Sequence, residues 1–204
     1  MSTALDTPII ALDAEAQDLL FREAHTAYGF TDEPVADEQI HQLYDLVKWA
    51  PTLMNTNPLR IVLVRSDDAR SRLLGHLAEG NRAKSEVAPL VAVLATDVDF
   101  HDTLPRLVPH FAGARDVFAD DAAKREAVAR HQAWLQAGYF ILGVRALGLA
   151  AGPMAGFDQD GVDADLLAGT SLRSFLVVNI GHPSDDGLRP RSPRLDATEA
   201  VITL

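Results

Sequence analysis

The feature that most constrains this chain is a long, nearly continuous apolar segment at residues 133–151, AWLQAGYFILGVRALGLAA. The segment is about as long as a helix that crosses a bilayer. Gln136 and Arg145 interrupt it, however, and three glycines weaken it as a membrane helix. We therefore predict the buried central helix of a soluble globular protein rather than a membrane span.

The composition indicates an ordinary globular protein. The chain has 204 residues, of which 48% are apolar and 23% are charged, and we predict one domain over residues 1–204. The 18 basic and 29 acidic residues give a formal charge of −11, which argues against a general nucleic-acid or membrane-surface binder. The chain has no cysteine, so disulfides, thiolate metal sites and a cysteine nucleophile are excluded.

The N-terminal residues do not resemble a signal peptide. The stretch MSTALDTPIIALDAEAQ has no basic start, and Asp6 and Asp13 interrupt it. We expect a cytoplasmic protein.

Hydrophobic periodicity predicts helices and short buried strands. We expect helices at 14–27, at 36–50, from Ser66 or Asp67 to near Gly80, at 120–148, and from about Asp158 to Gly169. We expect strands at 60–64, 89–98 and 174–181, and loops at 100–118 and 152–161. Because such apolar strands are usually covered on both faces, we predict helices on both sides of a small sheet.

Several common functional motifs are missing. No G-x-G-x-x-G follows a strand, and there is no Walker A loop and no G-x-S-x-G elbow. The seven histidines have no zinc-ligand spacing. His101 and His110 flank a Pro-containing loop, where packing is the simpler explanation than metal binding. We predict no metal site.

Two polar segments follow the first predicted helices. APTLMNTNPLR, residues 50–60, presents Thr52, Asn55, Thr56 and Asn57 along a connector, although turn chemistry alone explains such residues. GNRAK, residues 80–84, places Asn81 and Lys84 on one face of a helical turn, although a helix C-cap with a solvated lysine fits as well.

Two further segments lie later in the chain. GLAAGPMAGFD, residues 148–158, either lets the backbone approach a flat ligand or is an ordinary helix exit. RPRSPR, residues 189–194, is basic in an acidic chain. Arginine forks suit phosphate oxygens, but a nucleic-acid arm, a sorting signal and a solvated loop are also possible.

Together, and in this order, the four segments resemble the nitroreductase family of FMN-dependent oxidoreductases. WAPTLMNTNPLRIVLV is similar to the family's A-P-S-x-x-N-x-Q-P-W block and first strand, and GNRAKSEVAPLVAVLA to its N-x-x-K segment and second strand. ALGLAAGPMAGFD is similar to the G-L-G…P-x-x-G-F block, and RPRSPRL to the C-terminal K/R-x-R segment. The match spans residues 20–195. GPMAGFD and TDEPVADEQI resemble most the branch that contains malonic semialdehyde reductase.

The resemblance implies an α+β fold with three α-β-α layers. Its small mixed, mostly antiparallel sheet is flanked by helices, and a long buried central helix lies in an intertwined homodimer. FMN lies at the interface of such dimers, and each site takes residues from both chains.

The resemblance also implies a set of cofactor-binding positions, and it assigns no catalytic residue. They lie at the flavin ring, its pyrimidine and ribityl edge, and the phosphate, and they are His25, Thr26, Pro51, Thr52, Leu53, Asn55, Asn81, Lys84, Pro153, Met154, Ala155, Gly156, Arg191 and Arg194. A lysine near the pyrimidine edge stabilises the reduced flavin.

The chain departs from the family at its start. The family's R-x-S-x-R/K pattern falls on residues 24–28, where Thr26 can replace the serine but Ala24 replaces the first arginine. Arg22 and His25 are near. Phosphate binding therefore depends more on Arg191 and Arg194, or uses His25.

The implied activity is ping-pong reduction of a small aldehyde, an enal or a nitro compound by NADH or NADPH. A different function, that of a flavin carrier or sensor without turnover, fits the same binding residues. A nucleic-acid-binding protein is disfavoured by the net charge. The 100–118 loop is a candidate lid over the substrate.

Overall fold

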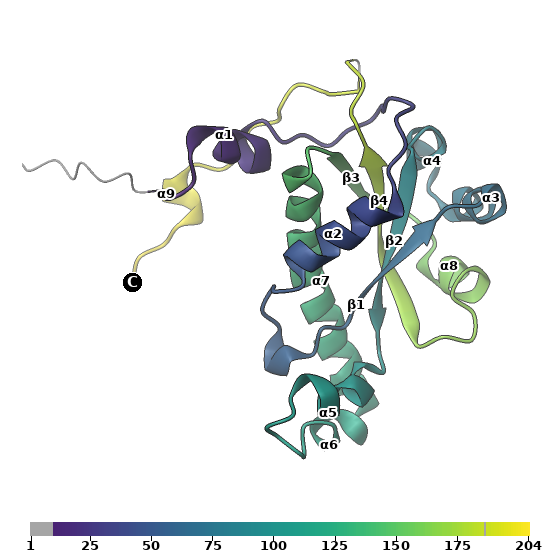
Figure 1. Cartoon of the computed structure of the whole chain (residues 1–204), viewed down its shortest axis with the longest axis vertical. Coiled ribbons are helices and arrows are strands. Elements are labelled where there is room, and N and C mark those ends of the chain that lie inside the picture. Colours follow the sequence, from purple (N-terminus) through teal and green to yellow (C-terminus); the bar gives the residue numbers. More distant parts are fainter. Residues whose placement is uncertain (1–9, 186) are drawn as a thin grey trace, which may run out of the picture.

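The sheet is the centre of the molecule. The computed structural model describes residues 10–185 and 187–204, and its four strands lie in the order β1-β2-β4-β3 (Figure 1). Every neighbouring pair is antiparallel, and an isolated parallel bridge joins Thr26 to Ala151. The strands are β1 (Leu59–Val64), β2 (Leu90–Asp97), β3 (Ala150–Met154) and β4 (Leu172–Gly181).

Helices cover both faces of this sheet, which confirms the predicted three layers (Figure 1). The helices are α1 (Ala14–Gln17), α2 (Asp37–Val47), α3 (Asp67–His76), α4 (Glu79–Glu86), α5 (Leu104–Leu107), α6 (Asp116–Ala119), α7 (Ala122–Ala146), α8 (Gln159–Asp165) and α9 (Ala197–Ala200). Three short turns of π or 3-10 type are η1 (Asp18–Arg22), η2 (Leu53–Asn55) and η3 (Phe100–Thr103).

Strand β2 shows why the layers form. Side chains alternate between the faces of a strand, and here both faces are apolar. Leu90, Ala92 and Leu94 join the core under α2 and α7. Val91 and Val93 join a second core with residues of α3 and α8. Neither face of the strand can remain in water, so helices must pack on both.

The central helix α7 packs on the sheet through small and aromatic side chains. Ala133, Ala137, Phe140 and Val144 are fully or almost fully buried against the strands. Asp121 caps its start, since Oδ1 accepts the Lys124 N–H at 2.9 Å. Among the described residues, no helix has the length and apolar character needed to cross a membrane.

Only one side of α7 is buried, however. Leu135 and Tyr139 are 44% and 40% exposed on its outer side, and Trp134, which is 41% exposed, lies at the flank of the helix with its ring 4.8 Å from that of Phe175. The sequence indicated burial all round this helix, because its apolar run has no polar face. The structure leaves the outer face for another partner.

Two predicted helices end earlier than expected. The helix predicted at 14–27 stops at Arg22, because residues beyond it extend and pair Thr26 with Ala151. The helix predicted to reach Gly80 breaks at Leu77, whose ψ of 143° is extended, and α4 begins two residues later. Asn81 and Lys84 are therefore inside a helix rather than at its C-cap.

The segment predicted as a loop from residue 152 contains the end of strand β3. Its glycines and proline hid the strand from a propensity argument, because both residues are rare in strands. Gly152 pairs with Asn179 of β4, and a Cβ there would lie 3.0 Å from the Ala27 carbonyl oxygen. Close packing between backbones therefore requires this glycine.

The predicted loop at 100–118 is folded into η3, α5 and α6 at one end of the molecule (Figure 1). Phe100, Leu104 and Phe118 are fully or almost fully buried there, and the two phenylalanine rings meet edge-on at 5.1 Å. The segment has its own small apolar core.

The crossing of α2 over α7 provides a test of the fold. A Cβ at Gly143 would lie 2.5 Å from Val47 Cγ1, so Gly143→Ala must push the two helices apart. We expect a loss of about 1–3 kcal/mol in the free energy of unfolding, measured by urea denaturation at a fixed protein concentration.

Gly75→Ala is the matched control. Gly75 lies inside α3 with no atom within 4 Å of its added Cβ, so alanine should stabilise the helix by about 0.5–1 kcal/mol. Equal effects of the two substitutions would contradict the packing described for Gly143.

Candidate functional site

A polar pocket of about 320 Å³ lies where residues 24–28 meet the loop 189–194. Four arginines line it, and no carboxylate among the residues that the structure describes does so. The lining residues are Ala24, His25, Thr26, Tyr28, Arg145, Arg189, Pro190, Arg191, Ser192 and Arg194. The structure thus brings together His25, Thr26, Arg191 and Arg194, the positions that the sequence predicted for a phosphate.

Backbone contacts hold this arginine loop in place. Arg191 Nη2 donates to the Ala24 carbonyl oxygen at 3.0 Å and also to that of Arg22. Arg194 Nη1 donates to the Ser192 carbonyl oxygen at 2.8 Å. Both side chains are positioned by carbonyl groups rather than by carboxylates, so their charges are not neutralised by these contacts.

Tyr28 connects the pocket to α4. The Arg189 guanidinium carbon lies 3.9 Å from the centroid of the Tyr28 ring, and Lys84 Nζ lies 5.1 Å from it. Burial lowers the pKa of Lys84, and the charge of Arg189 lowers it further. Lys84 therefore holds its proton less tightly than an exposed lysine does.

Residues 153–156 adjoin the same helix. Asn81 Nδ2 donates to the Gly156 carbonyl oxygen at 2.9 Å, and the Ala78 N–H donates to it at 3.1 Å. Asn179 of β4 donates from Nδ2 to the Lys84 carbonyl oxygen at 3.1 Å. A Cβ at Gly156 would lie 2.9 Å from Asn81 Nδ2. The pocket, α4 and the end of β3 are therefore contiguous.

The connector 51–57 lies elsewhere and is strained. Met54, Asn55 and Asn57 have φ between 42° and 54°, which is unusual for residues other than glycine. Asn55 Nδ2 donates to the Leu107 carbonyl oxygen at 3.0 Å, and the Asn57 N–H donates to Thr52 Oγ1 at 3.2 Å. These contacts fix a backbone that local propensity would not choose.

Two glutamines of α7 hold this connector. Gln132 Oε1 accepts the Leu53 N–H at 2.8 Å, and Gln136 Oε1 accepts the Leu59 N–H at 3.0 Å. Gln136 also donates from Nε2 to Asn57 Oδ1 at 3.2 Å. The buried glutamine that interrupts the apolar segment is thus fully used by the connector to β1.

The connector and the arginine pocket are far apart in one chain. Gln132 and Arg145 mark the two places on α7, and the rise of 1.5 Å per residue separates them by roughly 20 Å. One chain therefore does not bring Pro51, Thr52, Leu53 and Asn55 to the other predicted positions.

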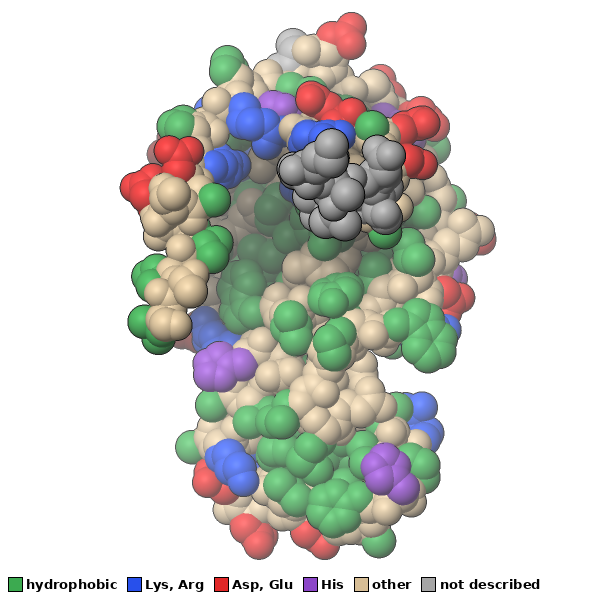
Figure 2. Space-filling model, turned by 90° about the vertical axis from the view of Figure 1, so that its left-hand side faces the viewer, with side chains coloured by type: hydrophobic (Ala, Val, Ile, Leu, Met, Phe, Trp, Pro, Cys, Tyr) green, Lys and Arg blue, Asp and Glu red, His purple; other side chains and the backbone are tan. Residues whose placement is uncertain are grey.

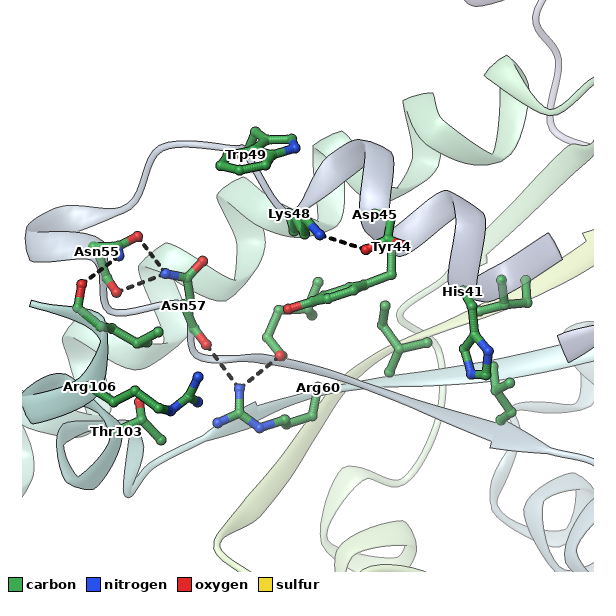
Figure 3. A pocket seen from close by; sticks show the side chains of 15 residues that line it. His41, Tyr44, Asp45, Lys48, Trp49, Asn55, Asn57, Arg60, Thr103 and Arg106 are labelled. Atoms are coloured by element: carbon green, nitrogen blue, oxygen red, sulfur yellow. Dashed lines mark hydrogen bonds and ion pairs between the residues drawn. The ribbon is translucent and has the colours of Figure 1, made fainter. Parts of the chain in front are cut away.

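A second, larger pocket of about 850 Å³ lies beside the edge strand β1 (Figure 3). Tyr44 and His41 enter it from α2, Arg60 from β1, and Arg106 from the 100–118 segment. Arg60 is paired with Asp97 at 2.6 Å. This pocket was not predicted from the sequence, because its walls come from elements that are separate along the chain.

The sequence also missed three residues of the arginine pocket: Tyr28, Arg145 and Arg189. Arg189 belongs to the basic segment 189–194, but the resemblance assigned a role only to Arg191 and Arg194 in that segment. Arg145 did carry a signal, because it is a charged residue in an apolar helix. A charged residue there predicts polar surroundings at the end of the helix, but it does not predict which residues form them.

The model of the "Nitroreductase family" matches residues 21–182. The chain belongs to the nitroreductase family. Its resemblance to this family, inferred from four short segments, is confirmed.

Two curated relatives cover almost the whole chain. A protein of Streptomyces griseus named "Putative NADH dehydrogenase/NAD(P)H nitroreductase" is 55% identical over 96% of this chain and 99% of its own. A protein of Leptothrix cholodnii with the same name is 53% identical over 95% and 98%. A protein of Exiguobacterium sibiricum, described as a "putative nitroreductase in complex with FMN", superposes with a TM-score of 0.81 at 18% identity, over 97% of this chain and 100% of that chain.

Within residues 10–185 and 187–204, no group of three or more His, Asp or Glu side chains is arranged to hold a metal ion. His101 is 6% exposed and packs edge-on against Phe100 at 6.3 Å, in the small core of the 100–118 segment.

Gln136 gives a direct test of how the connector is held. Gln136→Leu keeps the volume but leaves the Leu59 N–H and the Asn57 amide without their partner. We expect a loss of about 1–3 kcal/mol in the free energy of unfolding and faster hydrogen exchange at Leu59. Gln132→Leu, one turn earlier, exposes the Leu53 N–H to water and should cost less. The reverse order would contradict this account.

Proposed function

We propose that this nitroreductase-family chain is an FMN-dependent oxidoreductase that uses NADH or NADPH to reduce a small compound. The substrate classes are an aldehyde resembling malonic semialdehyde, an enal or a nitro compound. The observation that carries the proposal is the continuous path from the arginine pocket through Lys84 to residues 153–156. The names of the relatives support the electron donor, and the FMN complex of a structural neighbour supports the cofactor.

The residues of this path fit FMN. The pocket offers guanidinium groups and the Thr26 hydroxyl, which suit a phosphate, and none of its described lining residues is a carboxylate that would repel one. Gly156 leaves room where a side chain would collide with Asn81. When bound, FMN supplies the hydride transfer between nicotinamide and substrate that protein side chains cannot perform.

The residues of the chain divide the binding between them. Arg191 and Arg194, with His25 and Thr26, hold the phosphate. Asn81 and Lys84 bind the ribityl and pyrimidine edge, where the ammonium group stabilises negative charge. A further set gives the ring its backbone wall, and it is Pro153, Met154, Ala155 and Gly156.

We propose that the remaining positions come from a second copy of the chain. The connector with Pro51, Thr52, Leu53 and Asn55 is held at Gln132 and Gln136 of α7, too far from Arg145 to reach the path in its own chain. The exposed apolar face of α7 favours a homodimer, since Figure 2 shows hydrophobic side chains over this side of the molecule. Partner copies packed through α7 would bring each connector to the other copy's flavin.

The C-terminal residues support an intertwined form of this dimer. Val201, Ile202 and Leu204 are at least 69% exposed, and the segment extends away from the sheet (Figure 1). Among the described residues, the outer edge of β1 has no strand partner. The pocket beside β1 offers Ile40, Ile61 and other apolar side chains to such a segment.

We also propose one domain for the whole chain and a cytoplasmic location.

The function is tested by the visible spectrum of the purified protein. We expect a flavin spectrum, or uptake of added FMN, that NADH or NADPH bleaches under anaerobic conditions. Steady-state consumption of nicotinamide with an aldehyde, enal or nitro compound then distinguishes an enzyme from a flavin carrier. Protein that neither carries nor takes up FMN would refute the proposal.

The dimer is tested by Leu135→Glu, which places a charge in the exposed face of α7. We expect light scattering after gel filtration to show a monomer with weakened FMN binding, because a buried unpaired carboxylate is costly. Val87→Glu is the control, since Val87 is 58% exposed at the end of α4 and away from α7. A Leu135→Glu protein that remains a dimer with normal FMN affinity would contradict the arrangement.

A further inference from the structure

Arg145 is held in an unusual way at the end of α7. Its Nη1 donates to the Leu20 carbonyl oxygen at 3.1 Å, a contact that spans 125 residues of sequence. Its Nε is buried and has no hydrogen-bond partner among the described residues. A buried donor without a partner is costly, so such a group usually indicates a missing ligand or water.

The surroundings of Arg145 are strongly cationic. It shares the 320 Å³ pocket with Arg189, Arg191 and Arg194. Burial lowers the pKa of its guanidinium, and the charge of Arg191 lowers it further. No ion pair to Arg145 is formed by residues 10–185 or 187–204. In a chain of net charge −11, this concentration of positive charge needs a bound anion to offset it.

The pocket also lacks a charge where the family supplies one. Ala24 stands at the position of the family's first arginine, and it lines the pocket that Arg145 enters. The Ala24 carbonyl oxygen already accepts a hydrogen bond from the Arg191 guanidinium. A cation for this part of the pocket must come from another element.

We propose that Arg145 binds the phosphate of FMN directly and supplies the positive charge that the N-terminal segment lacks. This inference rests on the proposed function. The guanidinium is positioned by the Leu20 carbonyl oxygen, and the part of the side chain that lines the pocket donates to a phosphate oxygen.

Because Arg145 is part of helix α7, its contact with the phosphate costs little conformational entropy. Arg191 and Arg194 belong to an exposed loop near the chain end, whereas Arg145 stands on the 25-residue helix that packs on the sheet. A donor fixed on a rigid helix loses less conformational entropy on binding than one on a loop. Arg145 therefore orders the phosphate end of the site before the cofactor arrives.

Arg145 could instead serve only to tie Leu20 to α7, and a comparison of two flavins separates these roles. FMN carries the phosphate and riboflavin does not. We would titrate apo protein with each flavin, by quenching of flavin fluorescence, for wild type, Arg145→Met and Arg145→Lys. The Arg191→Ala/Arg194→Ala double variant is the positive control.

A phosphate contact predicts a selective loss. Arg145→Met should weaken FMN binding roughly tenfold or more and leave riboflavin binding within about twofold, since one charge-assisted hydrogen bond is lost. Arg145→Lys should recover part of the FMN affinity. Equal weakening of both flavins, or wild-type FMN affinity in Arg145→Met, would overturn the proposal.

Arg125→Met is the matched control for a structural arginine of the same helix. Arg125 donates to the carbonyl oxygens of Val98 and Phe118 at 2.9 Å and 3.0 Å, far from the pocket. Its loss should lower the melting temperature without changing the ratio of FMN to riboflavin affinity.

Inorganic phosphate separates this inference from the proposed function. If wild type binds neither flavin, the function falls, and the thermal shift caused by phosphate then decides the role of Arg145. Stabilisation by phosphate that Arg145→Met abolishes would support an anion site at Arg145. No stabilisation of wild type, or stabilisation that Arg145→Met retains, would overturn it.

Discussion

The packing of α7 on the middle of the sheet is the contact on which the other features depend. Ala133, Ala137 and Phe140 lie on the strands that are apolar on both faces, so the helix cannot shift without exposing the core. Gly143 lets α2 cross at the distance that this packing requires. Because α7 is fixed on the sheet, it also decides where the polar side chains in its middle and at its C-terminal end lie.

The middle and the C-terminal end of α7 organise two different polar regions. Gln132 and Gln136 hold the strained connector before β1, and Arg145 enters the arginine pocket. The two regions are roughly 20 Å apart along the helix. A rigid helix keeps them apart in one chain, and the proposed homodimer is the arrangement that allows both to serve one cofactor. Strain at Met54, Asn55 and Asn57 is consistent with a connector shaped for contact with another molecule.

Electrostatics explains how an acidic protein can attract an anionic cofactor. The chain carries a net charge of −11, yet four arginines line one pocket, and no carboxylate of residues 10–185 or 187–204 lines it. Figure 2 shows Lys and Arg side chains above a hollow with a hydrophobic floor. An anion at the pocket is attracted mainly by these nearby arginines. Salt screens most of the repulsion from acidic residues that are farther away.

The sequence by itself determined the elements whose pattern is local. The apolar strands, the central helix and the four polar segments follow from side-chain period and residue type. The strand β3 was not predictable from local sequence, because glycine and proline are rare in strands. It forms because it pairs with the edge of β4 and because Ala27 packs closely against Gly152. The early end of the first helix has the same origin, since Thr26 pairs with β3. The meeting of Arg145, Tyr28 and Arg189 was decided by tertiary structure alone, because these residues lie on three elements and only the packing of α7 brings them to one pocket.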